Sequence, residues 1–318
     1  QAEILGKSDP TVYMELAKAY TAAKKYSDAA SAYNANLKAN TKNQEAWIGL
    51  AQVYEKSRKD SLAAEAYIKA YELNPAKNQG LLARAGHILY KAGAKAQADK
   101  VYAQFVSKGY VDPQVNINSA RMAYDSKKYG DVIKLLSPLK GKPAGDKDVL
   151  RMLAESYANT KKYTEALAYA KKLVAKAPSD PGVVLLAAKA YEATGDLKSA
   201  TSTYQRYLSL PKAPNAREYS YHLAQLYEKA KLKSLAIQQY QNNAKKYATD
   251  YRNHERLGQL LMSTKRYTDA VKALSAVAAK TSSPPEIKRT LAEAYLKLKK
   301  YPQAAATFEK YVAVGKED

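Results

Sequence analysis

Residues 44–78 read QEAWIGLAQVYEKSRKDSLAAEAYIKAYELNPAKN, two apolar segments joined by a short polar turn. Six residues of this stretch repeat an arrangement found 34 residues earlier. Tyr13, Leu16, Ala17, Tyr20, Ala29 and Tyr33 return as Trp47, Leu50, Ala51, Tyr54, Ala63 and Tyr67. Six matches at one offset indicate a tandem repeat with a unit of 34 residues.

The same frame continues along the chain and predicts nine helix-turn-helix units. Their predicted bounds are 10–43, 44–78, 79–112, 113–146, 147–180, 181–216, 217–250, 251–284 and 285–318. Residues 1–9 are predicted to be the tail of a preceding repeat or a linker. Within a unit, apolar residues recur three and four positions apart, as in Leu150, Leu153 and Tyr157, which is typical of amphipathic helices. Prolines such as Pro75 and Pro178 mark the unit boundaries, because proline is disfavoured inside a helix.

Small residues recur at two positions of the unit and bulky ones at a third. Position 8 is Ala17, Ala51, Gly86, Ala120, Ala154, Ala188, Ala224, Gly258 and Ala292. Position 20 is alanine in every unit except the fourth, which has Val132, and position 24 is a large residue in every unit except the fifth, which has Ala170. The two helices of a unit are therefore expected to approach closely, with the bulky residue filling the space beside the contact.

These residues resemble the tetratricopeptide repeat, a 34-residue unit with a W-x2-L-G-x2-Y start, a small and an aromatic residue in its second helix, and a late proline. Trp47, Leu50, Ala51, Tyr54, Ala63, Tyr67, Ala70 and Pro75 carry the resemblance. It implies an all-α fold, a right-handed superhelical solenoid whose first helices line the concave side. The fourth unit departs most, with Asn116, Ser119 and Ala123 at sites that are usually larger or aromatic, so irregularity is expected in its first helix.

A partner-binding groove is predicted on the concave side, formed by positions 2, 5, 9 and 12 of each unit. Several position-5 residues are apolar, which is typical of peptide-docking surfaces. The candidate partner-binding residues are Met14, Ile48, Ile117, Leu185, Tyr221, Lys18, Gln52, Arg121, Tyr124 and Arg151. The chain is accordingly interpreted as a scaffold for a peptide or partner protein. The alternative is that these side chains pack on neighbouring helices.

A line of lysines in the intra-repeat turns supports a second hypothesis, an electrostatic adaptor for nucleic acid, an anionic polymer or lipid. It contains Lys24 and Lys25, Lys127 and Lys128, Lys161 and Lys162, Lys231 and Lys233, Lys265 and Arg266, and Lys299 and Lys300. The formal net charge of +22 favours anionic partners. Nucleic acid is the least expected of them, because lysine lacks the planar fork of arginine and most tyrosines occupy core positions. The competing interpretation is that lysine keeps exposed turns soluble.

Nothing in the sequence points to an enzyme or to a cofactor. It has no phosphate-binding loop, dinucleotide fingerprint or nucleophile elbow. His87, His222 and His254 lie in different units, and two histidines without a third ligand make a weak metal site. His254, at position 4, is expected in the core.

The 318 residues contain no cysteine, which excludes disulfides and thiolate sites. No apolar run is long enough to span a membrane, and residues 1–10 lack the pattern of a signal peptide. The cysteine-free, lysine- and alanine-rich composition weakly favours a bacterial periplasmic or envelope-associated location, with the cytoplasm as the alternative. Neither end has a polar capping repeat, so a fragment of a longer protein is expected, and self-association through the ends is a third hypothesis.

Overall fold

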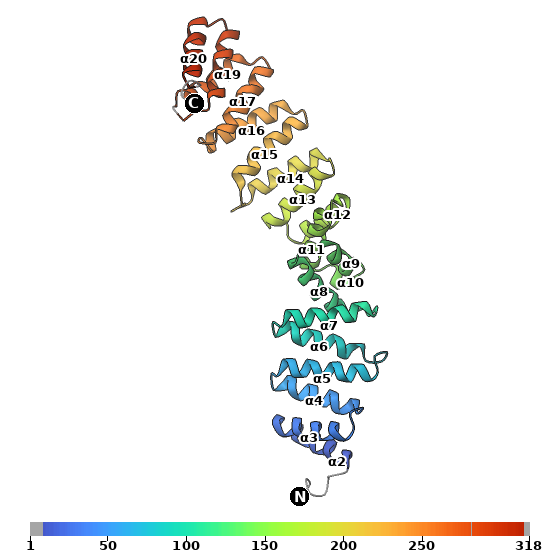
Figure 1. Cartoon of the computed structure of the whole chain (residues 1–318). Coiled ribbons are helices and arrows are strands. Elements are labelled where there is room, and N and C mark those ends of the chain that lie inside the picture. The colour runs from blue at the N-terminus through green and yellow to red at the C-terminus, as the bar shows by residue number, and fades with distance from the viewer. Residues whose placement is uncertain (1–8, 281, 315–318) are drawn as a thin grey trace. The chain divides into compact units, whose positions relative to one another are not determined.

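The computed structural model describes residues 9–280 and 282–314, and within them the chain consists of helices and turns without strands (Figure 1). The chain divides into two compact units, Gln1–Lys161 and Lys162–Asp318. The division falls between the two helices predicted for residues 147–180. Residues 1–8, predicted as part of a preceding repeat or linker, lie outside the described residues.

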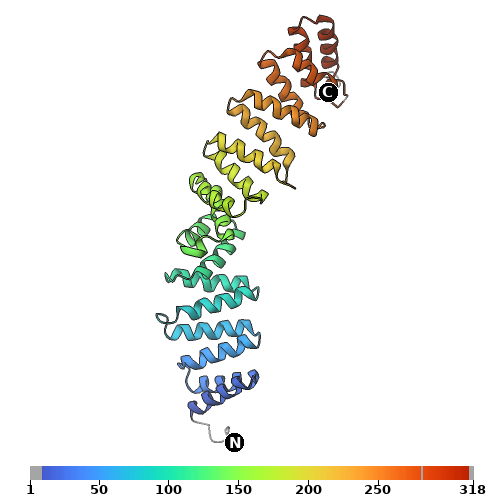
Figure 2. The ribbon, with the colours of Figure 1, turned by 180° about the vertical axis from the view of Figure 1, so that it is seen from behind.

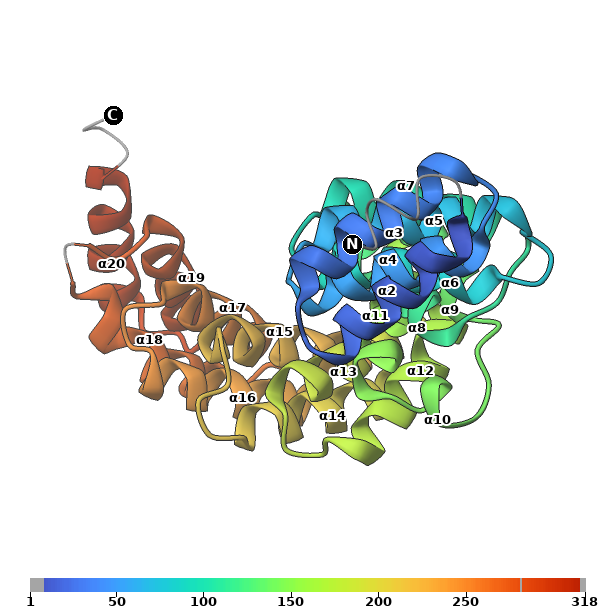
Figure 3. The same cartoon turned by 90° about the horizontal axis from the view of Figure 1, so that it is seen from below.

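The first unit is built from consecutive helices (Figures 1 and 2). From α2 to α9 each helix packs on the next along the chain, and α11 packs on α9. They are α2 (Pro10–Ala22), α3 (Tyr26–Ala39), α4 (Gln44–Lys56), α5 (Asp60–Leu73), α6 (Gln79–Lys91), α7 (Lys95–Ser107), α8 (Pro113–Asp125), α9 (Tyr129–Leu136), α10 (Gly141–Ala144) and α11 (Lys147–Asn159). Viewed from below, helices α2 to α7 overlie one another as a stack (Figure 3).

The second unit continues the same alternation of first and second helices. It contains α12 (Tyr163–Lys176), α13 (Pro181–Ala193), α14 (Leu197–Ser209), α15 (Ala216–Lys229), α16 (Lys233–Lys246), α17 (Tyr251–Ser263), α18 (Tyr267–Ala278), α19 (Pro285–Lys297) and α20 (Tyr301–Val314). From α12 to α20 each helix contacts its successor in sequence. Stacked helix pairs of this kind are a helical-repeat solenoid, which confirms the predicted fold class.

Aspartates and prolines start many of the first helices. The Asp9, Asp112 and Asp180 side chains accept hydrogen bonds from backbone N–H groups of the first turn, and each is followed by a proline at the first helical position. Asn43 and Asp146 cap α4 and α11 in the same way. These caps satisfy N–H groups that have no partner inside the helix.

Each first helix is followed, two residues after its end, by a residue in the left-handed conformation at position 15 of the unit. Glycine occupies it in two units, Gly93 (φ +79°) and Gly195 (φ +83°). Lysine or arginine occupies it in the other seven: Lys24, Arg58, Lys127, Lys161, Lys231, Lys265 and Lys299, with φ between 57° and 62°. A residue with a Cβ pays a steric penalty in this conformation, so these turns depart from the local preference of the backbone.

The core lies between the paired helices, where the predicted small positions meet. Ala17, Ala51 and Ala63 are fully buried. At Gly86 a Cβ atom would lie 2.4 Å from the Tyr102 ring, and at Gly258 it would lie 2.7 Å from Leu274. The residue at position 24 thus fills the space beside position 8, as the spacing predicted.

The expected irregularity of the fourth repeat lies in the other helix. Helix α8 has 13 residues, like most of its counterparts, so the prediction for the first helix was wrong. Helix α9 instead stops after 8 residues, and the short α10 follows. Pro138 explains this end, because proline cannot donate a helical hydrogen bond and disfavours helix at the residue before it.

Candidate partner-binding surface

Two predicted groove residues, Ile48 and Gln52, line a pocket on the first unit. The pocket has a volume of about 650 Å³. It is completed by Glu55 and Lys56 of α4, Tyr67 of α5, and Leu81 and Arg84 of α6. Its α4 wall therefore consists of positions 5, 9, 12 and 13 of the second repeat, on the face from which partner binding is expected.

The polar wall of this pocket is centred on Glu55. Its carboxylate accepts a hydrogen bond from the Tyr67 hydroxyl at 3.2 Å and bonds from Arg84 Nε and Nη2 at 3.1 and 2.9 Å. The Arg84 guanidinium also lies 5.5 Å from the centre of the Tyr67 ring. Burial raises the pKa of Tyr67, and the hydrogen bond to Glu55 raises the pKa of Arg84. The three side chains link two successive repeats in a fixed arrangement.

The same arrangement recurs in the second unit. Glu192 accepts from Tyr204 at 3.0 Å and pairs with His222 at 2.8 Å, and Glu228 accepts from Tyr240 and from Arg256 Nη2, both at 2.7 Å. In every case the glutamate is position 12, the tyrosine is position 24, and the cation or histidine is position 6 of the next repeat. We call these the inter-repeat triads: Glu55–Tyr67–Arg84, Glu192–Tyr204–His222 and Glu228–Tyr240–Arg256. These triads were not predicted from the sequence, although the recurring residue types at these positions were a usable signal.

A related contact joins the third and fourth repeats without a carboxylate. The Tyr102 hydroxyl accepts a hydrogen bond from Asn118 Nδ2 at 3.0 Å and lies 2.9 Å from His87 Nδ1. Burial raises the pKa of Tyr102 to about 12 and lowers that of His87. A neutral imidazole and a neutral phenol are therefore the forms present near pH 7.

Several of the remaining predicted residues make polar contacts between first helices. Lys18 pairs with Glu45 at 3.1 Å, and Arg121 pairs with Asp148 at 3.1 Å. Tyr124 donates to Glu155, whose pKa is raised by burial. Position 9 therefore reaches position 2 of the next repeat in two places.

The apolar candidates differ in how much surface they offer. Met14 is only 6% exposed and packs into the core, so its apolar character is explained by packing and we exclude it from the proposed groove. Ile117, Leu185, Tyr221 and Arg151 are partly buried. Leu185 and Tyr221 belong to the second unit and pack against its core. Here the alternative of packing between helices accounts for part of the pattern.

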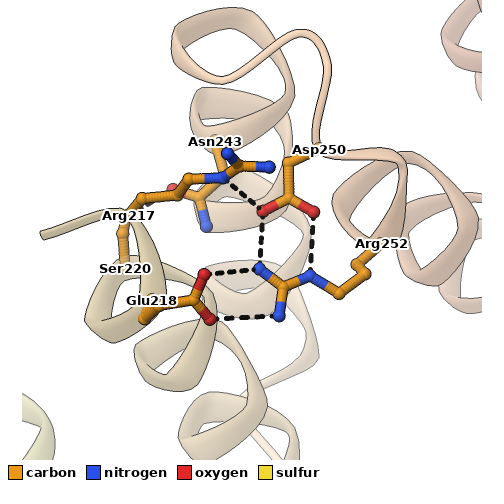
Figure 4. A network of polar contacts seen from close by, with 6 residues as sticks. All are labelled: Arg217, Glu218, Ser220, Asn243, Asp250 and Arg252. Carbon is orange, nitrogen blue, oxygen red and sulfur yellow. Dashed lines mark hydrogen bonds and ion pairs between the residues drawn. The ribbon is translucent and has the colours of Figure 1, made fainter. Parts of the chain in front are cut away.

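A buried carboxylate organises the polar face of the second unit (Figure 4). The Asp250 side chain is 2% exposed and accepts from Arg217 Nε at 3.0 Å and from Arg252 Nε and Nη2 at 2.9 and 2.8 Å. Arg252 also forms a two-pronged pair with Glu218 at 3.0 and 2.9 Å and lies 4.8 Å from the centre of the Tyr221 ring. The hydrogen bonds from Arg252 and Arg217 lower the pKa of Asp250 to about 2. This network joins α15 to α17.

The histidines are not gathered into a site. His254 is buried, as expected for position 4, and neither ring nitrogen has a hydrogen-bond partner within the described residues. No cluster of three potential metal ligands occurs in the part of the chain that the structure describes. Across the same residues, no helix has both the length and the apolar character needed to cross a bilayer.

Comparison with known proteins identifies the repeat. Two tetratricopeptide-repeat models match residues 160–226 and residues 14–78 and 255–317, which together make up more than half of the chain. The chain belongs to the tetratricopeptide-repeat family. No curated protein sequence matches it.

Solved structures show similarity at low sequence identity. One is the peptide-binding repeat protein YrrB, with 14% identity over 59% of this chain and 96% of that chain and a TM-score of 0.46. Another is MamA (AMB-1), with 20% identity over 54% of this chain and 93% of that chain and a TM-score of 0.42. A third is the human IFIT1 dimer with PPP-AAAA, with 17% identity over 96% of this chain and 73% of that chain and a TM-score of 0.39.

Proposed function

We propose that this chain is a protein-interaction scaffold that holds a peptide segment of a partner against the exposed faces of its first helices. Tetratricopeptide repeats are interaction scaffolds in general. The observation that carries the narrower proposal is the pocket containing Ile48, Gln52 and the Glu55–Tyr67–Arg84 triad. It combines an apolar wall with fixed charged groups, the combination that small binding sites use for affinity and orientation.

The apolar wall would take a side chain of the peptide, and the exposed polar groups would bind its backbone. Glu55 and Arg84 form an ion pair at 2.9 Å. A neutral peptide group can therefore bind beside them without leaving either charge buried and unpaired. Ile117 extends the surface in the fourth repeat. In the second unit, Leu185 and Tyr221 are the corresponding positions.

The test is to select peptides from a random phage-displayed library on the full chain and to measure their affinity for variants. Replacing Ile48 and Ile117 with aspartate should abolish binding, because each introduces a charge into an apolar contact. The matched control is Leu62→Asp on α5, where the leucine is 42% exposed and outside the pocket. Equal affinity of the Ile48 and Ile117 variant and the control, with helicity preserved, would refute the groove.

We propose a polyanion-binding role through the lysine line as the second candidate. The observation that favours it is the left-handed turn position, where six lysines and Arg58 stand in a conformation that suits glycine better. Lysine lowers the local stability of these turns relative to glycine. It also places a positive charge on an exposed part of the chain. An adjacent exposed cation doubles that charge in six of the seven turns: Lys25, Lys59, Lys128, Lys162, Arg266 and Lys300.

Heparin is a suitable probe for this role. Its affinity for the chain should fall steeply as salt rises, because each phosphate- or sulfate-type contact releases counterions. Replacing Lys127 and Lys128 with serine should weaken binding more than replacing Lys69 and Lys77, which removes the same charge outside the intra-repeat turns. A flat salt response, or equal effects of the two pairs, would exclude the lysine line as a binding surface.

A further inference from the structure

A second pocket lies in the first unit, between α7, α8 and α9. It has a volume of about 440 Å³ and shares no residue with the pocket of α4, α5 and α6. Ala103 and Val106 of α7, Met122 and Ala123 of α8, and Leu135 of α9 supply apolar lining. Its size falls within the range of small-ligand sites, about 300 to 1,000 Å³.

The origin of this pocket can be read from the repeat. Ala123 is position 11 of the fourth unit, and that position is otherwise tyrosine or leucine. The other members are Tyr20, Tyr54, Leu89, Tyr157, Tyr191, Tyr227, Leu261 and Tyr295. The fourth repeat alone lacks a large side chain there.

Equivalent repeats show where the missing ring would lie. The Tyr54 hydroxyl is 3.4 Å from Asn34 Nδ2, and Lys171 Nζ lies 5.3 Å from the centre of the Tyr191 ring. Asn34 and Lys171 are both position 25 of the preceding repeat. In the third repeat position 25 is Ala103, which lines the pocket together with Ala123. The pocket therefore lies beside position 25 of the third repeat, and in the two repeats compared a tyrosine ring lies beside this position.

We propose that this pocket binds a phenol-type aromatic ring, presented by a tyrosine side chain of a partner polypeptide. The ring would take the place that the chain's own tyrosine takes elsewhere in the stack. Ser119, at the pocket wall, has a buried hydroxyl without a hydrogen-bond partner among the described residues, and a phenolic hydroxyl is a partner it can use.

The charged rim favours a peptide over a free aromatic molecule. Lys95 pairs with Asp125 at 3.7 Å, while Asp99, Asp131 and Lys134 also border the opening. The rim therefore offers positive and negative groups to the peptide residues that precede and follow the bound tyrosine. The proposal concerns α7, α8 and α9 and does not depend on the groove of the first helices.

The probes are p-cresol, which is the tyrosine side chain alone, and N-acetyltyrosinamide, titrated into the full chain by ligand-observed NMR. Both should bind the natural chain. Ala123→Tyr should fill the pocket and weaken p-cresol binding by about tenfold or more. Ala123→Leu should do the same with a side chain that this position already carries at Leu89 and Leu261, should the larger substitution disturb folding.

The reciprocal variant is Tyr54→Ala, which removes the ring at the equivalent position of the second repeat. It should create a second p-cresol site, and Tyr191→Ala should do so in the second unit. Unchanged p-cresol binding in folded Ala123→Tyr and Ala123→Leu variants would overturn the site. Binding of p-cresol without binding of N-acetyltyrosinamide would overturn the peptide source and assign the pocket to a free phenol.

Discussion

At Gly86 the absence of a side chain sets how closely α6 and α7 approach. The Tyr102 ring occupies the space that a Cβ would need, and the Tyr102 hydroxyl is in turn held by Asn118. A single small residue therefore positions a contact that reaches into the next repeat. In the second repeat the same position is Ala51, which is fully buried.

Gly86→Ala should destabilise the chain by about 1 to 3 kcal/mol, because the buried Tyr102 must move to admit the methyl group. Chemical denaturation followed by circular dichroism measures the change. Gly80→Ala is the control, since nothing lies within 4 Å of the added atom and alanine is the better helix former. Equal stability of the two variants would show that the close approach is not rigid.

The left-handed turns make a second prediction at the scale of one residue. Gly93→Lys should lower stability by about 1 kcal/mol, because it puts a Cβ into the strained conformation. Lys127→Gly should raise stability by a smaller amount, since glycine also increases the entropy of the unfolded chain. Thermal unfolding of both variants measures whether stability falls in the first and rises in the second. A stabilising Gly93→Lys would remove the argument that lysine in these turns opposes the backbone preference.

The Asp250 network predicts a dependence of stability on pH. The pKa of Asp250 is lowered from 3.8 to about 2 in the folded chain, so its contribution is present above about pH 4 and is lost as pH falls toward 2. Asp250→Asn should therefore cost about 2 kcal/mol or more near pH 7, with the difference from the natural chain shrinking below pH 4. Urea titrations across this range measure it. Asp269→Asn, at an exposed pair with Arg266, should change stability by less than about 1 kcal/mol at any pH.

At the scale of helices, the triads are a recurring link between one repeat and the next. Glu228 is 16% exposed, whereas the partners of the Arg289–Glu293 pair on α19 are 60% and 42% exposed. Limited exposure and two hydrogen bonds from Arg256 favour a stronger interaction than a solvated helix pair provides.

A double-mutant cycle on Glu228→Ala and Arg256→Ala should give a coupling energy of about 1 to 2 kcal/mol. The same cycle on Arg289 and Glu293 should give about 0.3 to 0.5 kcal/mol, the range of helix pairs at this spacing. Denaturant unfolding of the natural chain and the six variants supplies both values. If the two couplings are equal, the triads add no more than surface pairs do.

The helices themselves were predictable from sequence, and some of their contacts were not. Recurring alanine and tyrosine fixed the register of the helix pairs, because packing requires small residues at fixed intervals. The end of α9 at Leu136 could have been predicted from Pro138. The small residues Ser119 and Ala123 leave α8 intact and line a pocket instead. The triads join residues from successive repeats, so predicting them requires comparing positions 12 and 24 of one unit with position 6 of the next. Met14 was predicted at the groove from its apolar character, but it is 6% exposed and its burial could not be read from its position in the unit.

For the whole molecule, stacking in sequence order means that each repeat depends mainly on its neighbours. A local defect should therefore weaken nearby repeats and leave distant ones unchanged. Gly86→Ala supplies the defect in the first unit, and hydrogen exchange read by mass spectrometry shows how far its effect extends. Exchange should accelerate in α5 to α8 and stay at its original rate in α15 to α20, with Gly80→Ala as the unperturbed reference. Acceleration throughout the chain would mean that it unfolds in one step, in which case a partner bound to the first unit would also stabilise the second. Confinement to α5–α8 would mean that the first unit can be altered without changing the stability of the second unit. Its two proposed pockets, one lined by α4 to α6 and the other by α7 to α9, could then be modified independently of the second unit.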